Sequence, residues 1–351
     1  MDIIRISFEC IKHATNHFSD QKRIGSGGFG KVYKGQLPHA NGYKSIAVKR
    51  FDGKPGEGDH AFYRELEVLF KFKHKKVIGL VGYCDEMDER IIVYEYASNG
   101  SLDDSLNNIC LTWMKRLEIC IDVASGLDFL HGGVLRQDAV VHRDIKSGNI
   151  LLSGDWKAKI TDFGLSLISP LNQEMDYVIE ENIAGTKSYI DPAYVETRRV
   201  SKASDIYSFG VVLFEILSGR PAYPTREYGN NYLGPLAKNY YEEGKLDELV
   251  FEGVKEKIVP QSLSTFAAIA YKCLHDDPDQ RPTASEVLVQ LNEAKEFQVD
   301  CEMWEPRLPI DYKEIIQQSR TPKICDTKKK ADLYEILCGG IIIQKGKLVN
   351  Y

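Results

Sequence analysis

The segment VHRDIKSGNILL, residues 141–152, places Asp144, Lys146 and Asn149 within six positions, between two apolar flanks. Any fold of this chain must therefore hold a carboxylate, an ammonium group and an amide at one point. A carboxylate there can accept a proton or orient a hydroxyl, and an ammonium group can neutralise charge on a moving group. The amide oxygen, with Asp162 of the following ITDFG segment, suits a hard cation such as magnesium.

A glycine-rich segment, IGSGGFGKV, spans residues 24–32. Its glycines let backbone N–H groups approach phosphate oxygens with no side chain in the way. A dinucleotide-binding fold uses the same spacing, but it needs a helix directly afterwards and an acid about 20 residues on. Here the strand-like KVYKG follows, and Lys49 stands where that acid would be. The remaining alternative is a plain flexible turn, and the presence of Lys49 argues against it.

Lys49 lies in the strand-like segment IAVKRF, where Ile46 and Val48 alternate with it. A lysine in such a strand commonly points to solvent, and the alternative is that it points into a cleft and binds phosphates as a point charge. A buried lysine needs a counter-charge, and Glu65 on the following helical segment can supply one.

The 351 residues suit roughly two or three domains or lobes. Up to about Tyr96, the runs KVYKGQL, SIAVKRF and RIIVYEY predict strands. One helix interrupts them in HAFYRELEVLFKFKH, where Phe62, Leu66, Leu69 and Phe70 fall on one face.

Helical patterns dominate after residue 100. The segment LTWMKRLEICIDVASGLDFLH predicts an amphipathic helix, and DIYSFGVVLFEILSG, apolar nearly all round, predicts a buried central helix. Thr283 and Glu286 have the spacing of a capping box. We therefore predict two lobes joined near Tyr94 to Ser98, with a ligand-binding cleft between them.

The composition narrows the class of protein. Hydrophobic residues make up 43% and charged residues 27%, as in a soluble globular protein, and the net charge of −6 predicts no attraction to nucleic acid or anionic lipid. Eight scattered cysteines without C-x-x-C spacing predict reduced, intracellular thiols and no zinc site. We expect neither a signal peptide nor a transmembrane segment.

The glycine loop, the strand lysine, HRDIKSGN and DFG match the protein-kinase signature in number, order and spacing. The sequence thus resembles a eukaryotic protein kinase over residues 18–297. This resemblance implies an α+β, bilobal fold with a small β-rich N-lobe (18–96) and a larger helical C-lobe (97–297). An N-terminal extension (1–17) would precede it, and a linker and tail (298–351) would follow.

The resemblance also implies residue roles. Asp144 would be the catalytic base, and Lys146 would neutralise charge on the transferred phosphoryl group. Lys49, paired with Glu65, would contact the α- and β-phosphates of ATP.

Asn149 and Asp162 would hold Mg²⁺, for which Mn²⁺ can substitute, and Tyr94 would be the gatekeeper residue. Val32, Ala47 and Leu151 would enclose the adenine, while backbone atoms of Glu95 and Ala97 would bind its edge. The full set of implied ATP-binding residues is Ile24, Gly25, Ser26, Gly27, Gly28, Phe29, Gly30, Val32, Ala47, Lys49, Tyr94, Glu95, Ala97 and Leu151.

Lys146, two places after Asp144, and the segment GTKSYIDPAY are similar to serine/threonine kinases, which transfer phosphate to protein hydroxyls. The segments FECIKHATNHFSDQKRIGSGGFGKVYKG, LVGYCDE, IVYEYASNGSL and DIKSGNILL resemble the plant receptor-like kinases of the Pelle-related group, especially the FERONIA-like branch. Those are usually transmembrane receptors. This chain is expected to be a receptor-like cytoplasmic form, in the cytoplasm or at the inner face of the plasma membrane beside a receptor kinase.

Arg143 precedes Asp144, and in kinases of this pattern that arginine meets a phosphate on the activation loop. The loop runs from Asp162 to Ala193, and we expect its phosphorylation to order it and raise activity. Thr186 is also expected, by similarity, to support Asp144. The candidate hydroxyls are Ser166, Ser169, Tyr177, Thr186 and Ser188.

Two positions depart from the family pattern. Ala193 stands where family members have a glutamate that pairs with a C-lobe arginine, here Arg281. Losing one partner of a buried ion pair costs about 3–5 kcal/mol, so either another acid serves or the loop is loosely held. We predict that Ala193→Glu raises the melting temperature. Ser188 replaces a more common glycine, and we expect a slightly different substrate-binding loop.

Two other functions are compatible with parts of this pattern. A pseudokinase or scaffold would bind ATP and partners without transferring phosphate, but it usually lacks the lysine or an aspartate, and Lys49, Asp144 and Asp162 are all present. A small-molecule phosphotransferase is less consistent with AGTKSYIDPAY. The segments RLPIDYKEII, KKKADLYEIL and GGIIIQKGKL resemble the opening of phloem-protein-2-like domains. The tail is expected to be a partly ordered, truncated extension of that kind rather than a complete domain.

Overall fold

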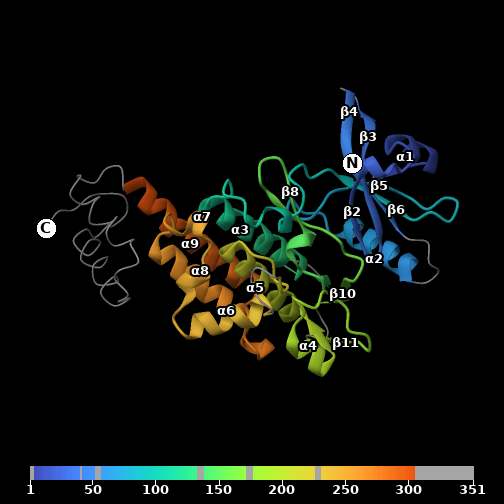
Figure 1. Cartoon of the computed structure of the whole chain (residues 1–351). Coiled ribbons are helices and arrows are strands. Elements are labelled where there is room, and N and C mark those ends of the chain that lie inside the picture. The colour runs from blue at the N-terminus through green and yellow to red at the C-terminus, as the bar shows by residue number, and fades with distance from the viewer. Residues whose placement is uncertain are drawn as a thin grey trace. The chain divides into compact units, whose positions relative to one another are not determined.

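The computed structural model describes residues 4–39, 42–51, 57–132, 138–170, 177–225 and 231–304. The chain forms two compact units, Met1–Gln298 and Val299–Tyr351. The tail segments that resemble a phloem-protein-2-like domain lie outside the described residues. The first unit carries the predicted site and has a β-rich lobe followed by a helical lobe (Figure 1).

The N-lobe is built on a six-stranded sheet of order β1-β5-β6-β4-β3-β2. Its pairs are antiparallel except for β1 and β5, which are parallel. The three predicted strands are confirmed as β3, β4 and β6. The elements of this lobe are β1 (Ile4–Arg5), α1 (Phe8–Ala14), β2 (Arg23–Gly27), β3 (Gly30–His39), β4 (Gly42–Phe51), α2 (Glu57–Lys71), β5 (Leu80–Cys84) and β6 (Ile91–Glu95).

The alternation of side chains along β4 decides which way Lys49 points. Ile46 and Val48 are buried in a cluster that includes Ile11 of α1, on one face of the sheet. Ala47 belongs to the other core, which α2 also contacts. Because successive strand residues face opposite sides, Lys49 shares the α2 side with Ala47. The segment before residue 18 therefore covers the outer face of the sheet, and the lysine points inward.

The inner face of α2 agrees with the predicted helical stripe except at one position. Phe62, Leu66 and Leu69 are buried, whereas Phe70 is 40% exposed, so its assignment to the buried face is wrong. At 3.6 residues per turn, Phe70 lies about 80° around the helix from Phe62. It therefore falls at the flank of the stripe, where its ring contacts Tyr83 with centroids 6.1 Å apart.

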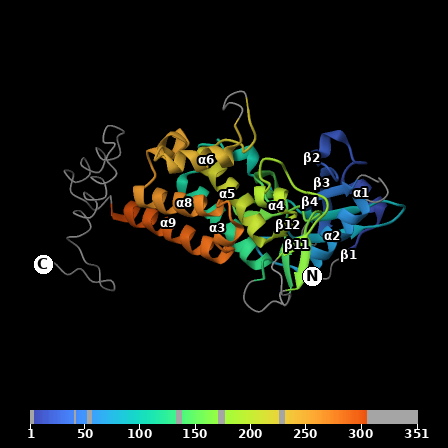
Figure 2. The same cartoon turned by 90° about the horizontal axis from the view of Figure 1, so that it is seen from below.

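The C-lobe is organised around α5, as predicted from its apolar sequence. Every residue of α5 from Ser204 to Ser218 is buried, and α3, α6 and α8 contact it (Figure 2). The predicted capping box is present, since Thr283 and Glu286 exchange hydrogen bonds where α9 begins. The helices are α3 (Trp113–Leu130), α4 (Pro192–Thr197), α5 (Lys202–Ser218), α6 (Leu233–Glu242), α7 (Glu252–Lys255), α8 (Pro260–Cys273) and α9 (Ala284–Trp304).

Short antiparallel ribbons carry the loops of the C-lobe. They pair β7 with β10, β8 with β9, and β11 with β12. Their bounds are β7 (Asp138–Val141), β8 (Ile150–Leu152), β9 (Ala158–Ile160), β10 (Leu167–Pro170), β11 (Tyr177–Ile179) and β12 (Arg199–Ser201).

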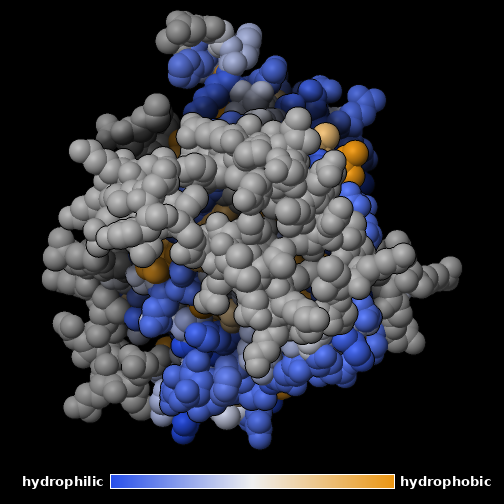
Figure 3. All heavy atoms as spheres, turned by 90° about the vertical axis from the view of Figure 1, so that its left-hand side faces the viewer, coloured by the Kyte–Doolittle hydropathy of each residue, from blue (hydrophilic) through white to orange (hydrophobic). Residues whose placement is uncertain are grey.

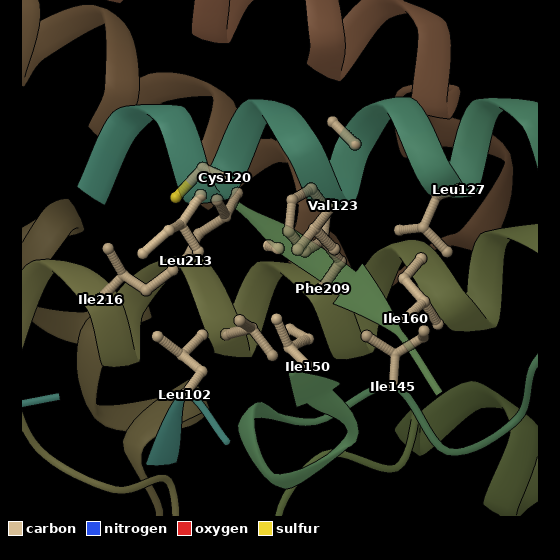
Figure 4. Close-up of a cluster of buried hydrophobic side chains, with 14 of the residues drawn as sticks. Leu102, Cys120, Val123, Leu127, Ile145, Ile150, Ile160, Phe209, Leu213 and Ile216 are labelled. Atoms are coloured by element: carbon tan, nitrogen blue, oxygen red, sulfur yellow. The ribbon is translucent and has the colours of Figure 1, made fainter. Parts of the chain in front are cut away.

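The hydrophobic core holds the loop between β7 and β8 from beneath. Ile145 directly follows Asp144, Ile150 directly follows Asn149, and both isoleucines are fully buried. Figure 4 shows them packed with side chains from α3 and α5. Burying each such side chain contributes roughly 1.5–3 kcal/mol. The polar residues of this loop are therefore positioned by the apolar residues beside them.

On the face shown in Figure 3, the coloured residues are mainly hydrophilic, with small separate hydrophobic spots. No helix in the described part of the chain is long and apolar enough to cross a membrane. Free thiols are found at Cys10, Cys84, Cys110, Cys120 and Cys273.

The activation segment is anchored by an ion pair that the sequence pattern did not identify. The guanidinium of Arg281 donates to both carboxylate oxygens of Asp191, at 2.7 and 2.8 Å, and both side chains are buried. Asp191 thus supplies the counter-charge for Arg281 that was expected from a glutamate at position 193. The expectation that Ala193→Glu raises the melting temperature is corrected accordingly, because Arg281 is already paired.

We predict that Asp191→Asn lowers the free energy of unfolding by about 3 kcal/mol, because it leaves a buried guanidinium without its counter-charge. Asparagine keeps the N-cap oxygen that accepts from the backbone N–H of Ala193, so the variant isolates the ion pair. Urea unfolding of the variant and the wild type measures the difference. Ala193→Glu is the matched control and should gain no stability. Equal stability of Asp191→Asn and wild type would contradict the assignment.

Candidate active site

Lys49 lies between two carboxylates in the core of the site. Its Nζ is 2.7 Å from Oε2 of Glu65 on α2 and 2.6 Å from Oδ1 of Asp162, which follows β9. Burial by itself would lower the pKa of Lys49, but the two carboxylates outweigh it and raise the pKa above its ordinary value. The structure therefore brings together a charged lysine and the two acids that the sequence placed near it.

Tyr94, the expected gatekeeper, also takes part in this cluster. Its hydroxyl donates to Oε1 of Glu65 at 2.8 Å. Burial and the neighbouring Glu65 raise the pKa of Tyr94 well above its ordinary value, so the hydroxyl keeps its proton. Glu65 is thus held from two sides, by Lys49 and by Tyr94. The hydrogen bond was not expected from the sequence, where Tyr94 was one aromatic residue in a strand.

The catalytic-loop residues form a second cluster around Asp144. Lys146 Nζ lies 2.7 Å from Oδ2 of Asp144 and 2.8 Å from Oγ1 of Thr186. The Thr186 hydroxyl donates to Oδ1 of Asp144 at 2.6 Å. Asn149 donates from Nδ2 to Oδ2 of Asp144 at 3.0 Å. These contacts fix the carboxylate in a single orientation, which a group that positions a substrate hydroxyl requires.

Asp205 stabilises this loop through hydrogen bonds to its backbone, a role that was not predicted from the sequence. Its carboxylate accepts from the backbone N–H groups of His142 at 2.7 Å and Arg143 at 2.8 Å. Nε2 of His131 lies 2.9 Å from the same carboxylate. Arg143 has a φ of +71°, a left-handed conformation that is uncommon for a residue with a side chain. An aspartate at the start of an otherwise apolar helix was the signal that could have identified it.

Asp162 sits at a strained point of the chain, with φ of +68°. The next residue, Phe163, is fully buried and contacts the His142 ring with centroids 4.9 Å apart. Burial would raise the pKa of Asp162, but Lys49 outweighs it and holds the pKa below its usual range. The buried phenylalanine thus anchors an ionised carboxylate beside Lys49.

The glycine-rich loop joins β2 to β3. At Gly30, φ is +147°, and a Cβ would come within 2.1 Å of the Arg50 carbonyl oxygen, so only glycine fits. Gly27 and Gly28, at the turn, would meet no neighbouring atom within 4 Å. The ring of Phe29 lies 5.8 Å from Lys49 Nζ. The loop therefore presents open backbone close to the lysine.

The residues expected around adenine fall into one region. Ala47 pairs with Tyr94 across β4 and β6, and the partly buried Val32 and Leu151 pack against the same core. Ile24, by contrast, is 49% exposed.

Two backbone hydrogen bonds form at the connection between the lobes. The N–H of Glu95 donates to the Gly79 carbonyl at 2.9 Å, and the Ala97 carbonyl accepts from Gly100 at 3.5 Å.

The candidate regulatory hydroxyls differ in accessibility. Ser166 is 1% exposed and donates to the His142 carbonyl, so its assignment as a modified residue does not agree with its position. Thr186 is engaged by Asp144 and Lys146, as described above. The other candidates, Ser169, Tyr177 and Ser188, are partly exposed.

A metal ion at this site would need ligands beyond the protein. Among the described residues, no group of three or more His, Cys, Asp or Glu side chains is placed to hold one. The amide nitrogen of Asn149 is committed to Asp144, which leaves its amide oxygen as the acceptor. One amide oxygen and the carboxylate of Asp162 fit magnesium, which is usually bound by one or two carboxylates together with substrate phosphates.

A buried network extends from the catalytic loop into α5. The Ser147 and Tyr189 hydroxyls are 3.0 Å apart, and Tyr189 donates to Oε1 of Glu215 at 2.7 Å. The backbone N–H of Ala222 donates to the same oxygen at 2.8 Å. Burial raises the pKa of Glu215 to about 8, so this side chain is largely protonated at neutral pH.

This fold, with the lysine in contact with Asp162 and close to the glycine loop, and with Asp144 in contact with Lys146, defines a protein kinase domain. Residues 18–291 match the family of protein tyrosine and serine/threonine kinases, and the chain belongs to it.

The chain is similar to receptor-like kinases of the plant Arabidopsis thaliana, of which three are described here. It is 42% identical to receptor-like protein kinase HERK 1 over 301 residues, which are 84% of this chain and 35% of the relative. It is 40% identical to receptor-like protein kinase FERONIA, over 84% of this chain and 33% of the relative. It is also 40% identical to receptor-like protein kinase ANXUR2, over 87% of this chain and 35% of the relative. The chain thus spans about a third of the length of the curated relatives it matches.

We predict that Glu215→Gln makes stability less dependent on pH. Between about pH 4.5 and 8 the folded wild type keeps a proton that the unfolded chain has lost, so its free energy of unfolding falls as pH rises, by at most about 1.4 kcal/mol per pH unit. Glutamine imitates the neutral acid and removes this titration. Urea unfolding from pH 5 to 8.5 measures both curves, with the exposed Glu196→Gln as control. Parallel curves for wild type and Glu215→Gln would contradict the prediction.

Proposed function

We propose that this chain is an ATP-dependent protein serine/threonine kinase that also phosphorylates itself. The observation that carries the proposal is the simultaneous placement of Lys49 against Glu65 and Asp162, and of Asp144 against Lys146 and Thr186. A pseudokinase usually lacks one of these groups, whereas here they are present and in contact.

The chain's own residues would act mainly by positioning and by charge stabilisation, because phosphoryl transfer asks for little covalent chemistry. Asp144 orients the substrate hydroxyl and accepts its proton as the oxygen bonds to the γ-phosphorus. The bond from that phosphorus to the β,γ-bridging oxygen breaks, and ADP leaves. Lys146 neutralises charge on the transferred group. Thr186 keeps both of these side chains in place.

For ATP, the backbone of the glycine loop would bind the phosphates and Lys49 would contact them as a point charge. Val32, Ala47 and Leu151 would enclose adenine. Asn149 and Asp162 would hold Mg²⁺, or Mn²⁺ in its place, and the metal would supply charge neutralisation on the phosphate oxygens.

The preference for serine and threonine rests on Lys146. Its Nζ contacts both Asp144 and Thr186, an arrangement that matches the serine/threonine catalytic loop to which the sequence is similar. The GTKSYIDPAY segment supports a peptide rather than a small-molecule substrate.

We infer a setting in receptor-like kinase signalling from the likeness to HERK 1 and FERONIA. The partner would be a membrane receptor kinase, with this chain in the cytoplasm or held at the inner face of the plasma membrane. A net charge of −6 argues against nucleic acid as a partner.

Incubation of the purified chain with Mg²⁺ and ATP tests the activity. We expect phosphate on serine or threonine, detected by intact mass and peptide mapping, and none in Asp144→Asn. That variant keeps the shape of the side chain but removes its charge. If neither protein gains phosphate or phosphorylates a generic protein substrate, while ATP still raises the melting temperature, the chain is an ATP-binding scaffold and the proposal fails.

A further inference from the structure

Glu180, directly after β11, reaches back to the arginine of the catalytic loop. Its Oε2 lies 3.3 Å from a terminal nitrogen of the Arg143 guanidinium. Its backbone N–H donates to the Arg198 carbonyl at 3.0 Å, which continues the pairing of β11 with β12. Both the side chain and the backbone of Glu180 are therefore fixed by neighbours.

The Arg143 side chain is almost fully enclosed, at 4% exposure, while that of Glu180 is 27% exposed. The other groups that accept from Arg143 are neutral. They are the Leu165 carbonyl at 3.4 Å, the Asn182 carbonyl at 3.5 Å and the Tyr194 hydroxyl at 2.9 Å. Within the described residues, Glu180 makes the one ion pair of this guanidinium. An enclosed cation depends strongly on its counter-charge, so Glu180 largely determines whether Arg143 remains in this position.

Arg143 connects the activation segment to the catalytic aspartate. It directly precedes Asp144, and its backbone N–H donates to Asp205. On the other side, the Tyr194 hydroxyl donates to the Asn182 carbonyl and accepts from Ala184, each at 3.2 Å. The pair of Glu180 and Arg143 therefore ties residues 180–184 to the loop that carries the catalytic base.

We propose that Glu180 is a built-in anionic activator, which supplies to Arg143 the negative charge that the sequence led us to expect from a phosphorylated hydroxyl. A carboxylate carries one negative charge, and a phosphate carries about 1.5 to 2. The two groups therefore differ in the size of their charge but not in its sign. Glu180 is a positioning residue that acts through Arg143. The inference rests on the proposed kinase function and specifies its regulation: the activation segment is ordered, and the site is competent, before any loop hydroxyl is phosphorylated.

The positions of two candidate hydroxyls support this inference. Ser166 is buried, and Thr186 is held by Asp144 and Lys146, so neither is placed to deliver a phosphate to Arg143. The side chain that contacts Arg143 from this segment is already an acid.

The test compares Glu180→Gln with Glu181→Gln, a matched control that removes an equal charge from the adjacent, exposed residue. All proteins are treated with phosphatase and confirmed to be phosphate-free by intact mass. Initial rates of transfer to a generic protein substrate then give kcat and KM for ATP. Hydrogen exchange of the backbone over residues 177–185 reports the order of the segment.

We expect the phosphate-free wild type to be active from the first turnover, without a lag. Glu180→Gln should lose at least tenfold in kcat with little change in KM for ATP, and its exchange over residues 177–185 should rise. Glu181→Gln should stay within twofold of the wild type, and Glu180→Asp, which restores the charge on a shorter side chain, should recover a large part of the lost rate.

Two results would overturn the inference while leaving the kinase function intact. One is a phosphate-free wild type that gains tenfold or more once its loop is phosphorylated. The other is a Glu180→Gln variant with wild-type rate and wild-type exchange. If no protein transfers phosphate under any condition, the proposed function fails instead. Unchanged exchange in Glu180→Gln would then also refute the ordering role of Glu180, whereas raised exchange would support it.

Discussion

One buried carboxylate, Asp205, fixes the geometry on which the site depends. It accepts from two successive backbone N–H groups of the catalytic loop and from His131, and it lies in the first turn of a helix that is mostly apolar and buried. A buried charge is tolerated only where hydrogen bonds satisfy it. Since these donors belong to the turn before Asp144, the same bonds that stabilise the carboxylate also hold the unusual backbone conformation at Arg143.

Around that anchor, charge pairs connect segments that are far apart in the chain. Lys49 and Glu65 come from the N-lobe and Asp162 from the C-lobe, so one cluster spans both lobes. Arg281 and Asp191 fix the end of the activation segment to the helical lobe, and Glu180 fixes its middle to the catalytic loop. The partners in each pair lie far apart in the sequence, so each pair limits the motion of the segment between them. The three sets of pairs involve different segments.

The sequence predicted most of the fold and the main members of the site. Strand alternation identified β3, β4 and β6, and the apolar periodicity of α5 identified a buried helix, because those patterns follow directly from the geometry of each element. One helical assignment failed because the position of a side chain depends on its neighbours: Phe70 falls at the flank of its helix and is 40% exposed. Asp191 and Asp205 were missed because an aspartate in a sequence does not show which distant cation or backbone it meets.

The sequence by itself determined which chemical groups this protein has: a glycine-rich loop, a lysine, and the acids and amide of one short loop. It determined these because local spacing within a strand, helix or turn is a property of the chain alone. The tertiary structure decided which side of the sheet Lys49 faces, that Tyr94 also holds Glu65, and that Asp191 and Glu180 supply the charges for Arg281 and Arg143. Those outcomes depend on the packing of residues distant in sequence, and the burial of each cation makes the identity of its partner energetically decisive.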